Sequence, residues 1–138
     1  MNQQQILDSL AGLALFSDLD RPRLQAVAHT MSEESFPSGQ RILRQGFSGS
    51  GFFVILEGEV VVRVDGGDVA VLGKGDFFGE ISLLLGEPPI ADVVAVGPVR
   101  ALHLAGPELR DFLLDYPQVM YRMLQAVGRR LDRANRRS

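Results

Sequence analysis

The sequence predicts a mainly β fold with flanking helices. Between residues 35 and 106, short apolar runs alternate with glycine-containing turns, and strands of this length and spacing are typical of a barrel or sandwich. The 15 glycines and 7 prolines make up about 16% of the chain, against a usual share of about 12%, which favours a turn-rich fold. Apolar residues at helical spacing lie on both sides of this region. With 138 residues, the chain has the length of one domain.

Residues 1–34 are expected to form N-terminal helices, with a break at residues 16–20. Asp20 is a candidate N-cap for the second helix, because its carboxylate can accept hydrogen bonds from the first free amides. Pro22 falls in the first turn of that helix, where a missing amide costs nothing. The apolar side of the second helix is expected to consist of Leu24, Val27, Ala28 and Met31.

The middle of the chain predicts short strands joined by tight turns. Glu57-Gly58 has the length and chemistry of a hairpin between two strands, and Gly97-Pro98 is expected to separate the last two. The strands are expected at residues 41–44, 52–56, 59–64, 69–72, 93–96 and 100–104. The other turns are expected at residues 37–39, 46–51, 65–68 and 73–76.

One leucine-rich stretch interrupts the strand pattern. Residues 80–85 follow Phe77-Phe78-Gly79 and predict a single turn of helix. Pro88 and Pro89 come next, and successive prolines favour an extended chain.

The C-terminal region predicts two helices. Residues 107–115 suit a helix with proline near its first turn, and Tyr116-Pro117 marks the joint to the second helix. On that helix, apolar residues recur at heptad-like spacing: Met120, Leu124, Val127 and Leu131. Two interpretations stay open, because such a seam serves either a helix docked on its own barrel or a helix that associates with a second copy.

The net charge of −3 is unevenly distributed along the chain. Residues 118–138 hold six of the 14 basic residues and only one of the 17 acidic residues. A basic end of this kind can contact nucleic acid or a membrane surface, but arginines on a terminal helix more often form a solvated face.

Several classes of protein do not fit the sequence. The absence of cysteine excludes disulfides and thiolate metal sites and fits a reducing compartment, so a cytoplasmic location is expected. No apolar run reaches the roughly 18 residues of a membrane-spanning helix. A signal peptide is not expected, because the N-terminus lacks a basic region and carries Asp8 within its apolar stretch.

No catalytic or metal-binding group is predicted, and the chain is not expected to be an enzyme. His29 and His103 are far apart and lack metal-ligand spacing, so structural roles are expected for both. Without cysteine or a serine in a nucleophile elbow, the chain has no candidate nucleophile. Gly73-Lys74-Gly75 lacks the spacing and the Ser/Thr of a P-loop, and residues 46–51 lack the glycine spacing of a dinucleotide site.

The segment from Phe77 to Pro88 carries the most information about function. Gly79 allows a close approach of the backbone, and Glu80 beside it can accept hydrogen bonds from the hydroxyls of a sugar. The short helix that follows presents free amides at its N-terminus, which can receive an anion. A capped helical turn between two strands has the same pattern, so this segment alone does not define a ligand.

This segment resembles the phosphate-binding cassette of the cyclic-nucleotide-binding domain family, which includes catabolite activator proteins, protein kinase A regulatory subunits and cyclic-nucleotide-gated channels. Residues 15–19 resemble the entry motif of the family, and residues 109–131 resemble its two closing helices. The turn glycines of the family are matched by Gly39, Gly46, Gly49 and Gly58. The resemblance implies one domain over residues 1–138. In it, an eight-stranded antiparallel β-roll at 35–106 would contain the cassette at 78–93, and closing helices would follow at 107–138.

The resemblance also implies a ligand pocket, whose residues carry over position by position. Gly79 and Glu80 match the ribose-binding pair of the family. The phosphate-binding arginine is replaced by Pro89, and the serine or threonine that assists it is replaced by Asp92. The implied pocket residues are Gly79, Glu80, Ile81, Ser82, Pro89, Ile90, Ala91 and Asp92.

These two departures weaken the expected binding of a phosphate. A hydrogen bond to a charged group contributes about 1.5–3 kcal/mol, so loss of the arginine costs about tenfold to a few hundredfold in affinity. Asp92 would also face the phosphate with a charge of the same sign. Two features offset the loss in part: protonation of Asp92 beside Glu80, or an arginine of the closing helix that reaches the pocket. The candidate arginines are Arg129, Arg130 and Arg133.

We therefore expect a non-enzymatic regulatory or docking module that does not bind cAMP or cGMP tightly and has no cofactor. A protein partner or a fused effector domain is expected, and a homodimer through the apolar seam is one such contact. The alternative is a ligand sensor that binds a cyclic nucleotide weakly, or a different small molecule in the same pocket. Specific DNA binding is not expected, because no helix-turn-helix follows the closing helix before Ser138.

Overall fold

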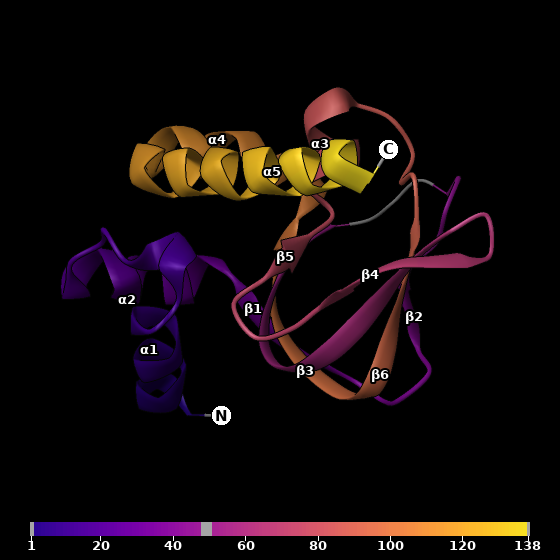
Figure 1. The fold of residues 1–138 in the computed structure, drawn as a ribbon. Helices are drawn as coiled ribbons and strands as arrows, with labels where there is room; N and C mark the ends of the chain where they lie inside the picture. The colour runs from indigo at the N-terminus through magenta and orange to yellow at the C-terminus, as the bar shows by residue number, and fades with distance from the viewer. Residues whose placement is uncertain (1, 48–50, 138) are drawn as a thin grey trace.

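Two long antiparallel strands, β3 (Gly51–Val64) and β6 (Asp92–Ala105), form the centre of the fold (Figure 1). The computed structural model describes residues 2–47 and 51–137. Over these residues, six strands form one antiparallel sheet in the order β1-β6-β3-β4, with β2 paired to β6 and β5 paired to β3. The short strands are β1 (Ser32–Phe36), β2 (Arg41–Leu43), β4 (Gly67–Leu72) and β5 (Phe77–Phe78).

Most of the helices gather at one side of the sheet, where α4 and α5 lie above α1 and α2 in the view of Figure 1. The helices are α1 (Gln3–Ala11), η1 (Ala14–Phe16), α2 (Arg21–Thr30), α3 (Glu80–Leu85), η2 (Gly106–Glu108), α4 (Leu109–Asp115) and α5 (Pro117–Arg137). In the described part of the chain, no helix has the length and apolar character needed to cross a membrane.

The predicted hairpin at Glu57-Gly58 is wrong, and so is the predicted break at Gly97-Pro98. Both β3 and β6 continue through these positions and pair with each other on either side of them, with shifts in register near Glu57. Gly58 has a φ of 91° and Gly97 a φ of 79°. Local sequence does not distinguish a hairpin turn from a bulge within a continuous strand, because a glycine with positive φ occurs in both.

Each long strand therefore replaces two of the predicted strands. If β3 and β6 are each counted as two segments on either side of the glycine, the six strands of the described residues correspond to eight segments. The predicted fold class, an antiparallel β-roll with helices at both ends of the chain, is confirmed.

The N-terminal helices end earlier than predicted, because residues 32–36 form β1 and pair with β6. This strand is mostly polar, so no alternation of apolar residues marks it in the sequence. Polar contacts connect it to β6: an ion pair joins Glu33 Oε1 to Arg100 Nε at 3.3 Å, and Glu34 Oε1 lies 3.4 Å from His103 Nδ1. The contacts that make this segment a strand are therefore tertiary.

Other local signals in the sequence are confirmed, at the start of α2 and at the turn between β3 and β4. The Asp20 side chain accepts a hydrogen bond of 3.0 Å from the Arg23 amide at the start of α2. Asp65 and Gly66 both have positive φ and join β3 to β4 in the two-residue turn that this geometry favours. The predicted apolar side of α2 is buried: Leu24, Val27, Ala28 and Met31.

One predicted turn lies partly outside the described residues. It covers residues 46–51, and Ser48, Gly49 and Ser50 within it are not described. The family-type turn glycine expected at Gly49 is therefore also outside the described structure.

The side chains of β3 alternate between two buried clusters. Phe52, Val54 and Leu56 belong to the cluster shared with the helices, whereas Phe53 and Ile55 belong to the cluster inside the roll. This alternation is the period of two that a strand imposes on its side chains. Both faces are buried here, so the roll has its own core on one face and the helices on the other.

We predict that Gly58→Ala destabilises the fold much more than Gly97→Ala. A Cβ at Gly58 would strike the carbonyl oxygen of Pro98, whereas a Cβ at Gly97 meets no described atom within 4 Å. The positive φ costs an alanine about 1–2 kcal/mol at either position, and the clash at Gly58 adds about 1–3 kcal/mol. Urea unfolding measures both effects, and equal losses would contradict the close approach at Gly58.

Candidate functional site

Gly79 positions the cassette against the sheet. It has a φ of 94° and caps the N-terminus of α3, the short helix predicted at residues 80–85. A Cβ at Gly79 would strike the carbonyl oxygen of Gly51 on β3. Only glycine therefore allows the chain to pass so close to β3 and then enter α3 with Glu80 as its first residue.

A cavity of about 700 Å³ that is open to one side lies between the cassette, strands β3 and β4, and helix α5. Seven of the eight residues expected in the pocket line it: Gly79, Glu80, Ile81, Ser82, Pro89, Ile90 and Ala91. Sequence analysis missed the wall that faces them, which contains Val62, Val64, Val69, Ala70, Val71 and Leu72. The apolar pattern of β4 predicts a strand, but it does not tell what the strand faces.

Asp92, the eighth expected pocket residue, is not among the residues that line the cavity. Its Oδ1 accepts a hydrogen bond of 2.7 Å from the backbone amide of Gln45, and its Oδ2 lies 3.9 Å from Arg41 Nε. The carboxylate therefore binds the chain that follows β2. This position differs from the expectation that Asp92 would face a bound phosphate.

Helix α5 contributes two arginines to the cavity wall. Arg130 and Arg133 line the cavity together with Val127, whereas Arg129 does not. A helical residue shares its face with the residues three and four positions away, and adjacent residues lie about 100° apart. Arg130 lies three positions after Val127 and therefore shares its face, and Arg133 lies three positions after Arg130. Helical spacing from Val127 thus selects Arg130 directly and Arg133 only through Arg130.

Glu80 is the buried charged group of the site, with 3% of its surface exposed. Its Oε1 accepts a hydrogen bond of 3.1 Å from Arg130 Nη1, while its Oε2 has no partner among the described residues. Burial removes the hydration of the carboxylate and raises the pKa of Glu80, and the positive charge of Arg130 only partly opposes this effect.

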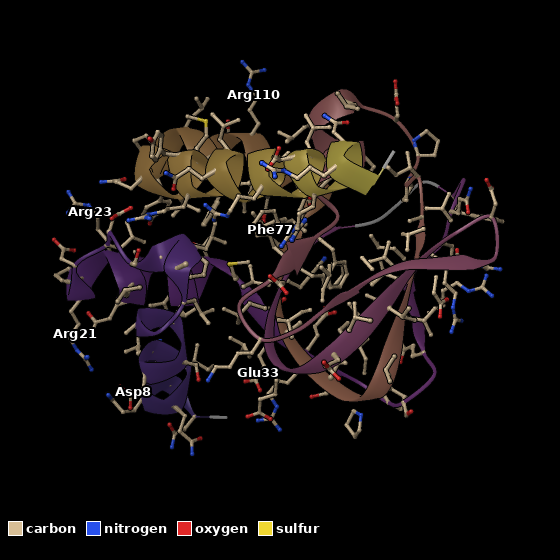
Figure 2. All side chains as sticks on the ribbon, viewed as in Figure 1. Asp8, Arg21, Arg23, Glu33, Phe77 and Arg110 are labelled. Carbon is tan, nitrogen blue, oxygen red and sulfur yellow. The ribbon has the colours of Figure 1, made fainter. Side chains whose placement is uncertain are left out.

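Arg130 makes two further contacts with Phe77, the residue labelled beneath α5 in Figure 2. Its Nη2 donates a hydrogen bond of 2.7 Å to the Phe77 carbonyl oxygen, and its Cζ lies 4.4 Å from the centre of the Phe77 ring. The Arg130 side chain therefore connects the C-terminal half of α5 to Phe77 and Glu80.

A second arginine anchors the other half of α5. Arg122 donates from Nε and Nη2 to the two carboxylate oxygens of Asp18, at 2.7 and 2.9 Å. The hydrogen bond from Arg122 is the main cause that lowers the pKa of Asp18. This pair connects α5 to the segment between η1 and α2, on the side of the helix bundle away from the cassette.

Within residues 2–47 and 51–137, no group of three histidine or acidic side chains could hold a metal ion. His103 lies 4.8 Å from the Phe53 ring, centre to centre, and pairs with Glu34 on β1. Its contacts join strands, as expected of a structural residue.

A comparison with known sequences places the sheet and the cassette in a known domain family. The profile of the cyclic nucleotide-binding domain matches residues 33–116, which span the sheet, the cassette and α4. The chain belongs to the cyclic nucleotide-binding domain family. It is accordingly a regulatory module of the kind that this family supplies to larger proteins.

Two curated relatives illustrate this. The cGMP-dependent protein kinase egl-4 of Caenorhabditis briggsae is 36% identical over 100 residues, which cover 68% of this chain and 13% of the kinase. The CRP-like cAMP-activated global transcriptional regulator of Mycobacterium tuberculosis is 26% identical over 131 residues, which cover 91% of this chain and 58% of the regulator. The chain thus spans a small part of the kinase and just over half of the regulator.

Solved structures show the same fold. The catabolite activator protein of Thermus thermophilus has a TM-score of 0.78 at 28% identity, over 88% of this chain and 60% of that protein. The regulatory subunit of a cAMP-independent protein kinase A from Trypanosoma brucei has a TM-score of 0.80 at 28% identity, over 91% of this chain and 46% of that chain.

We predict that the stability of the wild type relative to Glu80→Gln increases as the pH falls. Because burial raises the pKa of Glu80 above the ordinary value of 4.5, the folded protein binds this proton more readily than the unfolded chain does. The resulting stabilisation is complete below the unfolded pKa and is lost as the pH rises through the folded pKa. Glutamine does not titrate, so the difference between the two proteins isolates Glu80.

Urea unfolding of both proteins between about pH 4 and pH 8 measures this difference. A difference that stays constant with pH, or that decreases toward acid, would contradict the raised pKa.

Proposed function

We propose that this chain is a non-enzymatic regulatory or docking module that does not bind cAMP or cGMP tightly. The observation that carries the proposal is Pro89, which lies in the cavity wall where the resemblance implies a phosphate-binding arginine. Proline offers a phosphate neither a charge nor an amide donor. The cassette, residues 78–93, contains no lysine or arginine that could replace it.

Two arginines of α5 line the cavity, and one of them is already engaged. The guanidinium of Arg130 binds Glu80 and the Phe77 carbonyl. Arg133 is the other basic residue of the cavity lining, and it comes from α5 and not from the cassette. A bidentate arginine–phosphate pair lies at the strong end of charged hydrogen bonds, so its absence costs about tenfold to a few hundredfold in affinity.

A sensor of a different small molecule is the alternative function, and the cavity itself favours it. Its volume of about 700 Å³ is in the range of small-molecule sites, and most of its lining side chains are apolar. The buried Glu80 Oε2 lacks a donor among the described residues, and buried polar atoms normally have one. A ligand with an apolar body and one hydroxyl or amine donor would meet both conditions without a phosphate.

We predict that calorimetric titration detects no binding of cAMP or cGMP to the wild type at micromolar affinity. Pro89→Arg is expected to raise the affinity about tenfold to a few hundredfold, because it restores the charged contact. Asp92→Thr is the matched control, since Asp92 binds the Gln45 amide and does not line the cavity. The control is expected to leave the affinity unchanged.

Wild-type binding at micromolar affinity or tighter, abolished by Glu80→Ala, would overturn the proposal. An equal gain from Asp92→Thr and Pro89→Arg would show that the missing arginine is not the cause of weak binding.

We also propose that the module acts through contact with protein, and that a second copy of the chain is one partner. Of the apolar seam predicted on α5, Val127 packs toward the fold and lines the cavity. Leu131 also lines the cavity, although it is largely exposed. Met120 and Leu124 are exposed and do not line the cavity. The two interpretations of the seam thus apply to different parts of it, and Met120 and Leu124 favour self-association through α5.

We predict that Leu124→Glu reduces self-association and that Leu114→Glu does not. Both leucines are exposed, at 67% and 60%, but Leu114 lies on α4 and outside the seam. A charge within an apolar helix interface opposes association, whereas a charge on a solvated face does not. Sedimentation velocity over a range of concentrations measures the effect. A wild type that stays monomeric, or a Leu124→Glu variant that still associates, would contradict the homodimer.

A further inference from the structure

Arg130 makes three contacts, and each depends on a different property of its guanidinium group. Glu80 Oε1 meets its charge at 3.1 Å from Nη1. The Phe77 carbonyl accepts from the second nitrogen, Nη2, at 2.7 Å, and the Phe77 ring lies under its carbon at 4.4 Å. An ammonium group is a compact point charge without a plane or a fork, so it cannot satisfy all three contacts in this way.

The acceptor groups belong to elements other than α5. Glu80 is the first residue of α3, and Phe77 belongs to β5, which pairs with β3. With α5 in place, these residues are 3% and 2% exposed. The Phe77 ring also packs against Phe52, with ring centres 5.7 Å apart. The Arg130 side chain, by contrast, remains 26% exposed and reaches the recess formed by Glu80 and Phe77 from helix α5. The groups that bind the guanidinium, Glu80 and Phe77, therefore lie in or next to the cassette, and the guanidinium itself comes from α5.

The recess has one unused acceptor. Glu80 Oε2 is buried without a partner among the described residues, because Arg130 directs one nitrogen to Oε1 and the other to the Phe77 carbonyl. A guanidinium that is free of the helix has five N–H donors and can bind both oxygens of a carboxylate at once. The geometry thus offers an untethered ligand more hydrogen bonds than Arg130 makes.

We propose that the recess formed by Glu80 and Phe77 is a guanidinium-binding site, which Arg130 occupies in cis and thereby holds α5 closed over the cavity. A free guanidinium compound takes the site when Arg130 is removed. The tethered group competes at an effective concentration on the order of millimolar, so the wild type responds weakly to the free compound. The proposed site involves neither Pro89 nor Asp92, and its test uses no cyclic nucleotide.

The test uses the full chain, methylguanidinium chloride as the probe, and the midpoint of thermal unfolding as the readout. Methylammonium chloride at the same concentration controls for ionic strength and for a cation without a plane. Arg130→Ala is expected to gain a few degrees from millimolar methylguanidinium but not from methylammonium. Arg129→Ala is the matched control, because Arg129 is an exposed arginine of α5 that does not line the cavity. The double variant Arg130→Ala with Glu80→Gln is expected to lose the response.

Hydrogen exchange of the amides of residues 126–137 tests whether Arg130 holds the helix. Exchange is expected to be faster in Arg130→Gln than in the wild type and unchanged in Arg129→Gln. Equal exchange in the two variants would overturn the role of Arg130 in closing α5. A response of Arg130→Ala to methylguanidinium no larger than that of Arg129→Ala, or one that survives Glu80→Gln, would overturn the guanidinium site. If Arg130→Ala folds poorly, refolding promoted by methylguanidinium and not by methylammonium supports the site, and failure of both counts against it.

Discussion

The antiparallel pairing of β3 with β6 holds the other elements of this domain in place. It runs from Gly51 opposite Ala105 to Arg63 opposite Asp92, with β1 and β2 attached to β6, and β4 and β5 attached to β3. The cassette lies between β5 and β6 in the chain, so this pairing closes the cassette into a loop against the sheet. Gly79 completes the arrangement, because the absence of a Cβ lets the loop touch the backbone of β3.

One buried carboxylate determines the electrostatics of that cavity. Removing Glu80 from water costs free energy, and a cation that donates a hydrogen bond to it recovers part of the cost. The cassette holds no basic residue, so the cation has to come from another element, and α5 supplies it through Arg130. The position of α5 is thereby connected by charge to the cassette that lines the cavity.

Sequence patterns were reliable where a structure depends on neighbouring residues. The short helix at residues 80–85 and the cap at Asp20 follow from local spacing and capping chemistry, and both are present. Patterns failed where the partner is distant. Gly58 looks the same in a hairpin and in a bulge, and only the facing strand β6 decides between them. The polar residues of β1 carry no strand pattern, and they form a strand because β6 offers them an edge.

The sequence by itself determined the fold class and the short helix at residues 80–85, because these depend on residue identity and local spacing. Only the tertiary structure decided that Asp92 binds the Gln45 amide, and that Arg130 is the arginine that binds Glu80. Each contact joins residues far apart in the chain, 47 positions in the first case and 50 in the second. Which of several nearby arginines reaches the carboxylate depends on how α5 is rotated when it packs on the fold, and packing is a property of the whole chain.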